Sequence, residues 1–193
     1  MKFIINTLVE QLINNNIIER KMKQEYFYAL EVFFEKLIIY ISILIISVYL
    51  DLLIPTLIFL VFFCGLRSRT GGYHLNTYLK CFIGTVGIYV MFAKWLYPWL
   101  NKNINYIFPI LFFSLVFIFT IGAVNHPNIN WSKTELEETK KASRAMIFLQ
   151  CISIISFTVL GVHKDCIIFA TLGVMLCAIL LIAAKICKQE VRE

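Results

Sequence analysis

Six apolar runs alternate with short polar segments along most of the chain. A membrane-spanning helix needs about 20 mainly apolar residues, and most of the runs approach that length. Lysines, arginines and acidic residues gather between the runs and are rare inside them. The pattern predicts six membrane-spanning helices, of which the second is short for a full crossing, at about residues 37–50, 52–66, 79–99, 104–124, 145–162 and 166–184.

The first 36 residues follow a different pattern. Apolar residues at helical spacing share one face of residues 3–13, with polar residues between them: Ile5, Leu8, Val9, Leu12 and Ile13. This spacing predicts an amphipathic helix lying at the membrane interface. Asn16 and Glu19, three residues apart, resemble a capping box that opens a second helix.

The expected organisation therefore has three parts. Residues 1–36 form interfacial amphipathic helices, residues 37–184 form the membrane bundle, and residues 185–193 form a tail. The start of the chain lacks the continuous apolar core and cleavage site of a secretory signal, so we expect it to be retained.

Composition supports an all-α polytopic membrane protein. Of the 193 residues, 60% are hydrophobic and only 16% are charged, which excludes an ordinary soluble domain. The net charge of +6 is scattered beside apolar segments and forms no single stripe, so we expect no nucleic-acid partner. The six cysteines show no paired spacing, and we expect no disulfide framework.

Lysine and arginine positions predict the orientation in the membrane. With both termini in the cytoplasm, 15 of the 18 lysines and arginines lie inside. Lys102 and Lys164 fall in outer turns, and Lys94 lies near the outer end of the third span. This bias is what the positive-inside rule requires. Residues 133–144, which mix lysines with glutamates, then lie inside and are expected to form a solvated linker.

One cytoplasmic stretch, RSRTGGYHLNTYLKC at residues 67–81, concentrates reactive groups. A histidine near a cysteine favours the thiolate, which is the nucleophilic form, and Lys80 adds positive charge next to Cys81. On one straight helix, His74 and Cys81 would lie ~10 Å apart, too far for direct proton transfer. Gly71 and Gly72 permit a backbone bend that would bring the histidine back towards the cysteine.

Other interpretations of the same residues stay open. Cys81 can be a packing residue and His74 a solvated loop residue. A metal site is less favoured, because these two would need Cys64 or His126 as further ligands. The arginines of the stretch, Arg67 and Arg69, can anchor the topology or contact a substrate.

These residues resemble the accessory gene regulator protein B family. The resemblance rests on Arg67, Arg69, Gly71-Gly72-Tyr73-His74 and Cys81 in a protein of this length and hydropathy, and on a second motif, Ala123-Val124-Asn125-His126-Pro127-Asn128. The family consists of membrane cysteine endopeptidases that mature the precursor of a quorum-sensing autoinducing peptide in Gram-positive bacteria. The resemblance implies a bacterial cell-membrane location, with the active site at the cytoplasmic interface.

The resemblance also implies roles for particular residues. His74 is the expected general base and Cys81 the nucleophile; Arg67 or Arg69 and Gly72 are supporting residues. A third catalytic member is not evident: Asn76, Asn125, His126 and Asn128 are candidates to orient the imidazole, but His-Pro-Asn also suits a turn at a helix end.

The implied substrate is a precursor peptide with an amphipathic leader, a central segment with an internal cysteine or serine, and an acidic tail. Cys81 would release the tail through an acyl-enzyme thioester, and ring closure would give a thiolactone or lactone. The implied partners are this peptide, membrane lipid and a second copy of the chain, and no cofactor or metal is implied. A peptide or anion transporter or channel is the rival function, although the spans carry few charges.

Overall fold

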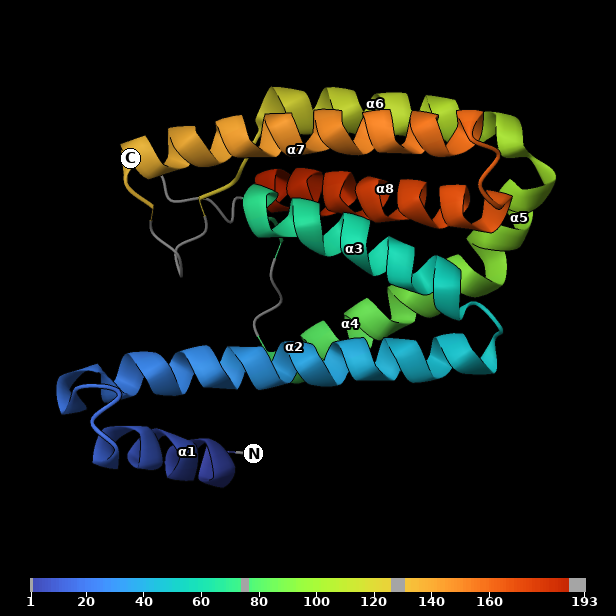
Figure 1. Ribbon diagram of the computed structural model, residues 1–193. Coiled ribbons are helices and arrows are strands. Elements are labelled where there is room, and N and C mark those ends of the chain that lie inside the picture. The colour runs from blue at the N-terminus through green and yellow to red at the C-terminus, as the bar shows by residue number, and fades with distance from the viewer. Residues whose placement is uncertain (1, 74–76, 126–130, 188–193) are drawn as a thin grey trace. The chain divides into compact units, whose positions relative to one another are not determined.

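The computed structural model describes residues 2–73, 77–125 and 131–187. Regular secondary structure in these residues is entirely helical, which confirms the all-α class. Figure 1 shows the order along the chain: α1 (Lys2–Asn14), η1 (Arg20–Met22), α2 (Lys23–Tyr49), α3 (Leu53–Thr70), α4 (Tyr78–Met91), η2 (Phe92–Leu96), α5 (Tyr97–Lys102), η3 (Ile104–Tyr106), α6 (Ile107–Ile121), α7 (Lys133–Val159) and α8 (Lys164–Ile186).

The chain divides into two compact units, Met1–Ile45 and Ile46–Glu193, with the boundary inside α2. In the first unit, α1 buries Ile5 and Val9 in an apolar cluster. The cluster is completed by residues of α1 itself, of the turn that follows it and of α2: Leu12, Ile13, Ile18, Phe27, Leu30 and Phe34. A helix is therefore present where the amphipathic pattern predicts one, and Ile5 and Val9 on its apolar face pack against the chain itself. Its location at the membrane interface and the division at residues 36 and 184 stay predictions. Lys23 donates a hydrogen bond to Glu10, and this bond lowers the pKa of the Glu10 carboxyl.

The predicted capping box at Asn16 and Glu19 is wrong. Asn16 adopts φ of 54°, a left-handed conformation that ends α1, and an N-cap needs extended backbone instead. Glu19 precedes the short turn η1 without a capping side-chain hydrogen bond, and α2 begins only at Lys23.

Five helices of the described residues are long and apolar enough to cross a membrane. They are Leu53–Thr70, Tyr78–Lys102, Ile104–Ile121, Lys133–Val159 and Lys164–Ile186, and each contains one of the predicted spans or most of it. The predicted first span, residues 37–50, belongs to α2, which is not among the five, and its crossing stays a prediction.

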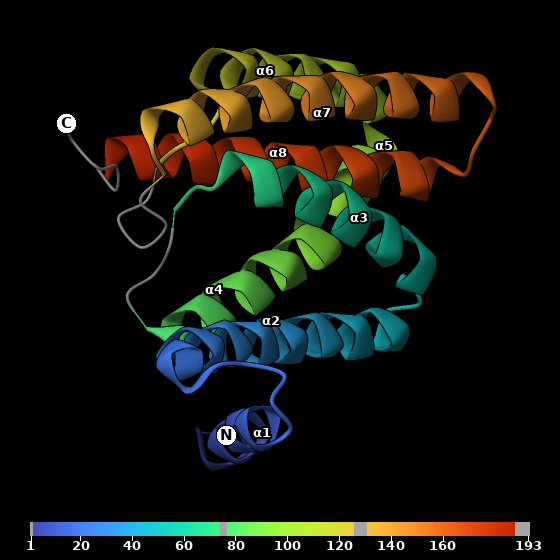
Figure 2. The ribbon, with the colours of Figure 1, turned by 60° about the vertical axis from the view of Figure 1, so that its left-hand side comes forward.

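The second unit is built around α8. In its most apolar 18-residue window 72% of the residues are buried, against 17–33% for the other four helices. Figures 1 and 2 show α3, α6 and α7 lying around α8. At Gly173 the backbones of α3 and α8 come so close that a Cβ atom would lie 2.9 Å from the Phe59 carbonyl oxygen. Small residues allow this close approach in membrane bundles, where packing drives helix association.

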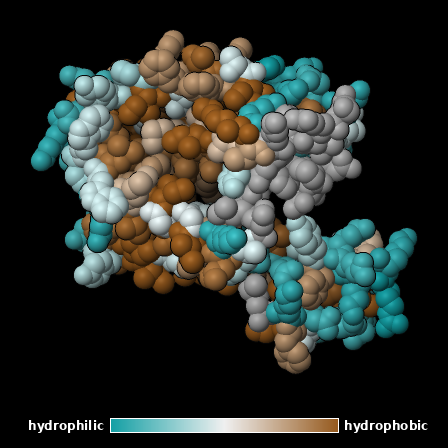
Figure 3. All heavy atoms as spheres, turned by 180° about the vertical axis from the view of Figure 1, so that it is seen from behind, coloured by the Kyte–Doolittle hydropathy of each residue, from teal (hydrophilic) through white to brown (hydrophobic). Residues whose placement is uncertain are grey.

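The flanks of this unit are apolar. Figure 3 shows hydrophobic side chains over much of one face of the bundle, and large exposed residues such as Phe112, Phe113 and Ile155 contribute to the apolar surface. A soluble monomer rarely exposes so much apolar surface, whereas lipid tails cover it readily.

Residues 133–144 do not form the predicted linker. They are the first three turns of α7, which starts with a capping box in which Ser132 and Glu135 bond reciprocally. A salt bridge between Lys140 and Glu137 supports the helix one turn later. The S-x-x-E signature at 132–135 is visible in the sequence and explains why this polar segment is helical.

The π-helical segment η2 lies between α4 and α5. Pro98 has no N–H to donate to the Lys94 carbonyl, so the regular ladder is interrupted there. The Tyr97 N–H bonds instead to the carbonyl of Phe92, five residues back. The three elements still run as one 25-residue helix, Tyr78–Lys102.

Candidate functional site

Residues 71–73 connect the end of α3 to His74 in the sequence. Gly71 and Gly72 follow the helix with φ of 63° and 124°, angles that side chains on a Cβ disfavour. The predicted glycine bend is therefore present. His74, Leu75 and Asn76 lie outside the described residues, so the predicted fold-back of the histidine onto Cys81 stays a prediction.

Arg67 holds the backbone just before His74. Its Nη2 donates a hydrogen bond of 2.9 Å to the Tyr73 carbonyl oxygen. The Tyr73 N–H donates in turn to the Leu180 carbonyl of α8, at 3.0 Å. Both polar backbone groups of Tyr73 are thus fixed by partners on two different helices.

Gly72 makes room for this arrangement. It is buried, and a Cβ atom there would lie 2.1 Å from Arg67 Nη1 and 3.3 Å from the Leu180 carbonyl carbon. The Arg67 guanidinium thus lies directly against the backbone of Gly72, and any side chain at this position would collide with the guanidinium.

Arg69 has a different role. Its Nη1 donates a 2.8 Å hydrogen bond to the Gly65 carbonyl, within α3 itself. The sequence left Arg67 and Arg69 as equal candidates for the supporting residue. The geometry separates them, because the guanidinium of Arg67 reaches the segment before His74 whereas that of Arg69 bonds to its own helix.

This difference makes a testable prediction. Arg67→Lys keeps the charge but replaces the planar fork of donors, so the hold on Tyr73 is lost. If the chain cleaves a precursor peptide as the resemblance implies, we expect cleavage by the reconstituted protein to fall roughly 10- to 100-fold, because small displacements of a reacting group are costly. Arg69→Lys is the matched control and should stay within about threefold of wild type. Equal losses in both variants would contradict the assignment.

The second predicted motif lies against the first. The Val124 N–H donates to the Thr70 carbonyl at 3.0 Å, and a Cβ on Gly71 would lie only 2.9 Å from the Val124 carbonyl oxygen. Segments more than 50 positions apart in the sequence thus meet at the glycine pair. The sequence contained no signal for this contact.

Asn125 is hydrogen-bonded to the backbone of Trp131. Its side-chain amide donates to the Trp131 carbonyl at 2.8 Å, and its Oδ1 accepts from the Trp131 N–H at 2.9 Å. The side chain is therefore engaged in tying the two ends of residues 125–131 together. His126 and Asn128, the other candidates on this motif, lie outside the described residues.

Cys81 lies in the first turn of α4. Thr77 caps this helix: its hydroxyl accepts from the Lys80 N–H at 3.4 Å, and its carbonyl accepts from the Cys81 N–H at 3.0 Å. The Cys81 side chain is half-buried, and Lys80 is exposed.

The other cysteines have different surroundings. Three of them, Cys151, Cys166 and Cys177, are buried, and Cys177 donates to the Phe63 carbonyl at 3.4 Å between α8 and α3. Cys64 is half-buried and Cys187 is exposed at the end of α8. All six are free thiols. Cys81 differs from the buried three in being accessible to a reactant.

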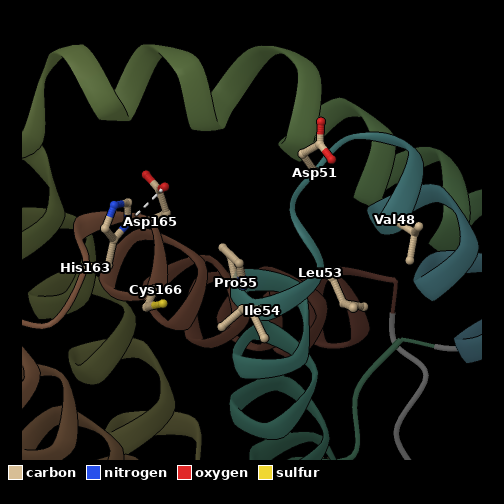
Figure 4. A pocket seen from close by; sticks show the side chains of 8 residues that line it. All are labelled: Val48, Asp51, Leu53, Ile54, Pro55, His163, Asp165 and Cys166. Carbon is tan, nitrogen blue, oxygen red and sulfur yellow. Dashed lines mark ion pairs between the residues drawn. The ribbon is translucent and has the colours of Figure 1, made fainter.

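A hollow lies at the other end of this unit, where α3 and α8 begin (Figure 4). It is lined by Val48, Asp51, Leu53, Ile54, Pro55, His163, Asp165 and Cys166. His163 Nδ1 and Asp165 Oδ2 lie 3.1 Å apart, and their side chains point towards one another in Figure 4. The hollow therefore contains a second histidine and a second cysteine, His163 and Cys166.

Within the described ranges, no group of three or more histidine, cysteine, aspartate or glutamate residues is placed to hold a metal ion.

The helices and their apolar surface define a polytopic all-α membrane protein, with a fixed glycine bend before His74 and a cysteine opening the next helix. The model of the accessory gene regulator B family matches residues 5–182, so the chain belongs to that family. The family takes part in processing the autoinducing peptide, which implies a peptide precursor as substrate. No curated protein and no solved structure matches the chain.

Proposed function

We propose that this protein is a membrane cysteine endopeptidase that cleaves the precursor peptide and promotes its cyclisation. The observation that carries the proposal is the double hold on Tyr73 by Arg67 and Leu180. Only residues 74–76 separate this fixed point from Thr77, which caps the helix of Cys81. In this proposal, the short connection keeps His74 close to the start of α4.

In the first step, His74 takes the proton of the Cys81 thiol, and the thiolate attacks the carbonyl carbon that ends the central segment of the precursor. The carbon–nitrogen bond breaks, and the imidazolium gives its proton to the departing amine of the acidic tail. The products are a free tail and an acyl-enzyme thioester on Cys81.

In the second step, the internal cysteine or serine of the bound segment attacks the thioester. Its proton passes to His74 and then to the departing Cys81 sulfur as the carbon–sulfur bond breaks. A thioester or ester ring forms and the enzyme is regenerated. A site partly shielded by the bilayer limits competing hydrolysis and keeps the ring nucleophile near the carbonyl.

The surrounding charges suit this substrate. Lys80 is exposed beside Cys81, and Arg69 lies in the last turn of α3. In the proposed orientation, with both termini in the cytoplasm, these cations face anionic lipid headgroups and the acidic tail. We further propose that the protein acts as a homodimer in the membrane, with the basic faces of both copies next to the same area of the membrane surface.

The acyl-enzyme is the species that tests the chemistry. A precursor whose internal cysteine or serine is replaced by alanine can be cleaved but cannot close its ring. We expect purified enzyme in vesicles to release the tail from this precursor and to accumulate a peptide adduct on Cys81, measured by intact mass.

Hydroxylamine should remove the adduct within minutes, as expected of a thioester. Tail release without any adduct would contradict the acyl-enzyme and indicate direct hydrolysis. Transport of the precursor across the vesicle membrane without any cleavage would support the rival transporter instead.

A further inference from the structure

The half of α4 that carries Cys81 is loosely packed. None of the residues from Tyr78 to Ile88 is buried, and a Cβ added at Gly87 would meet nothing within 4 Å. Figure 2 shows α4 diverging from α3 towards its N-terminal end. Among the described residues, the first buried contacts of α4 therefore lie further along the helix.

The first buried residue of α4 is Tyr89, which is 1% exposed. Its hydroxyl lies 2.7 Å from the Thr56 hydroxyl on α3, and Ser47 in the last turns of α2 also hydrogen-bonds with it. Thr56 and Ser47 are themselves fully buried. Three helices thus share one cluster of hydroxyl groups in an apolar interior.

Aromatic contacts surround the same point. The Tyr89 and Phe92 rings lie 6.1 Å and 6.5 Å from the ring of Phe59 on α3. Immediately beyond, the π-helical segment Phe92–Leu96 interrupts the regular ladder of hydrogen bonds. The anchor of α4 therefore lies between a loosely packed segment that carries Cys81 and an irregular segment of helix.

We propose that Tyr89 is a positioning residue for Cys81: its hydroxyl, bonded to Thr56 and Ser47, sets the direction in which α4 presents the thiol to His74. The inference rests on the proposed function. Tyr89 lies eight residues after Cys81, slightly more than two turns along the helix, so its Cα is displaced by ~12 Å along the axis and rotated by roughly 80°. A small tilt at Tyr89 becomes a displacement of an ångström or more at the thiol.

The Tyr89 hydroxyl restricts the orientation of α4, in addition to the packing that the ring provides. A ring contact tolerates sliding, whereas a hydrogen bond between buried hydroxyls is favourable only over a narrow range of distance and angle. In an apolar interior an unmade bond leaves a costly unsatisfied group, so the arrangement is strongly preferred. Arg67 and Gly72 set the path of the chain at Tyr73, and Tyr89 anchors the helix that carries Cys81.

The test compares Tyr89→Phe with Thr56→Val and with the double variant. Phenylalanine keeps the ring contacts with Phe59 and removes only the hydroxyl. The matched control is Tyr106→Phe, because Tyr106 is exposed and lies outside α4. Tyr89→Phe removes the bonds to both Thr56 and Ser47, whereas Thr56→Val leaves the bond to Ser47. We expect cleavage to fall about tenfold in Tyr89→Phe and by a smaller factor in Thr56→Val, with little further loss in the double variant, because Tyr89→Phe has already removed the bond to Thr56.

Cysteine alkylation by iodoacetamide, followed residue by residue by mass spectrometry against pH, gives a readout beyond stability. The rate at Cys81 should lose its His74-dependent component in Tyr89→Phe and match that of His74→Ala. Cys187, which is exposed, should react as in wild type, and Cys177, which is 0% exposed, should stay unreactive if the fold is intact.

The outcomes separate the two proposals. If His74→Ala leaves both cleavage and the Cys81 alkylation profile unchanged, the proposed function fails and this inference fails with it. If His74→Ala changes the profile but Tyr89→Phe does not, the proposed function stands and the inference alone is overturned. New reactivity at Cys177 in Tyr89→Phe would show a general loss of packing, and the positioning role would likewise be rejected.

Discussion

Replacing Cys81 by alanine is expected to abolish precursor cleavage, with a loss of at least roughly 10³-fold, because the proposed mechanism forms the acyl-enzyme on the Cys81 sulfur. His74→Ala should have an effect of similar size, since the two residues act as one unit. Combining the two substitutions should add little to either alone. The measurement is tail release from a cognate precursor by enzyme reconstituted in vesicles.

Cys81→Ser refines this test. A serine hydroxyl at the same place is a much weaker nucleophile than a thiolate, so cleavage should also be lost. Each variant should still insert into membranes, as judged by its yield after detergent extraction, because Cys81 is only half-buried and contributes little to packing.

The chain provides a matched control for both residues. His163 and Cys166 form the second histidine and cysteine neighbourhood, in the hollow at the other end of the bundle. His163→Ala and Cys166→Ala should each retain cleavage within a few fold of wild type. Cleavage retained in Cys81→Ala and lost in Cys166→Ala would reject the proposed site in favour of the hollow.

Gly72→Ala is the second change with a large expected effect. The glycine has φ of 124°, and alanine there adds strain of about 1–3 kcal/mol. The added methyl group would also collide with the Arg67 guanidinium, 2.1 Å from its Cβ position. Arg67 must then release the Tyr73 carbonyl, and we expect cleavage to fall about 100-fold through misplacement of His74.

Gly87→Ala is the control for this change. Gly87 lies within α4, and a Cβ at this position would meet nothing within 4 Å. Alanine should therefore be neutral or slightly stabilising, because it favours the helix more than glycine does. Thermal denaturation in detergent would separate a loss of stability from a loss of activity. Gly72→Ala should lose far more cleavage activity than its shift in melting temperature explains. Wild-type activity in Gly72→Ala would contradict the role of the bend.

Much of the fold can be predicted from the order of residues. Runs of apolar residues near 20 in length have few alternatives to membrane helices, and five of the six predicted runs lie in such helices. The prediction of a linker at residues 133–144 was wrong, because a polar segment can also form a helix. Residues 133–144 are charged but helical, because Ser132 and Glu135 cap α7 and the Glu137–Lys140 pair supports it.

The site was predictable only in part. The glycine pair correctly indicated a bend, because few other residues adopt positive φ, and Thr77 caps the helix of Cys81 as short polar residues commonly do. Asn125, in contrast, was a candidate to orient the imidazole, and the structure shows its side chain bonded to the backbone of Trp131. Nothing in local sequence distinguishes an asparagine that orients a histidine from one that closes a loop.

The sequence by itself determined the membrane class, the candidate residues His74 and Cys81, and the family, since hydropathy and short motifs are properties of neighbouring residues. Only the tertiary structure decided that Arg67, and not Arg69, holds the segment before His74, and that Tyr89 anchors α4. The physical reason is that these decisions depend on donors meeting acceptors on other helices. Tyr73 meets Leu180 and Thr70 meets Val124, and helix packing alone brings such distant groups within hydrogen-bond distance.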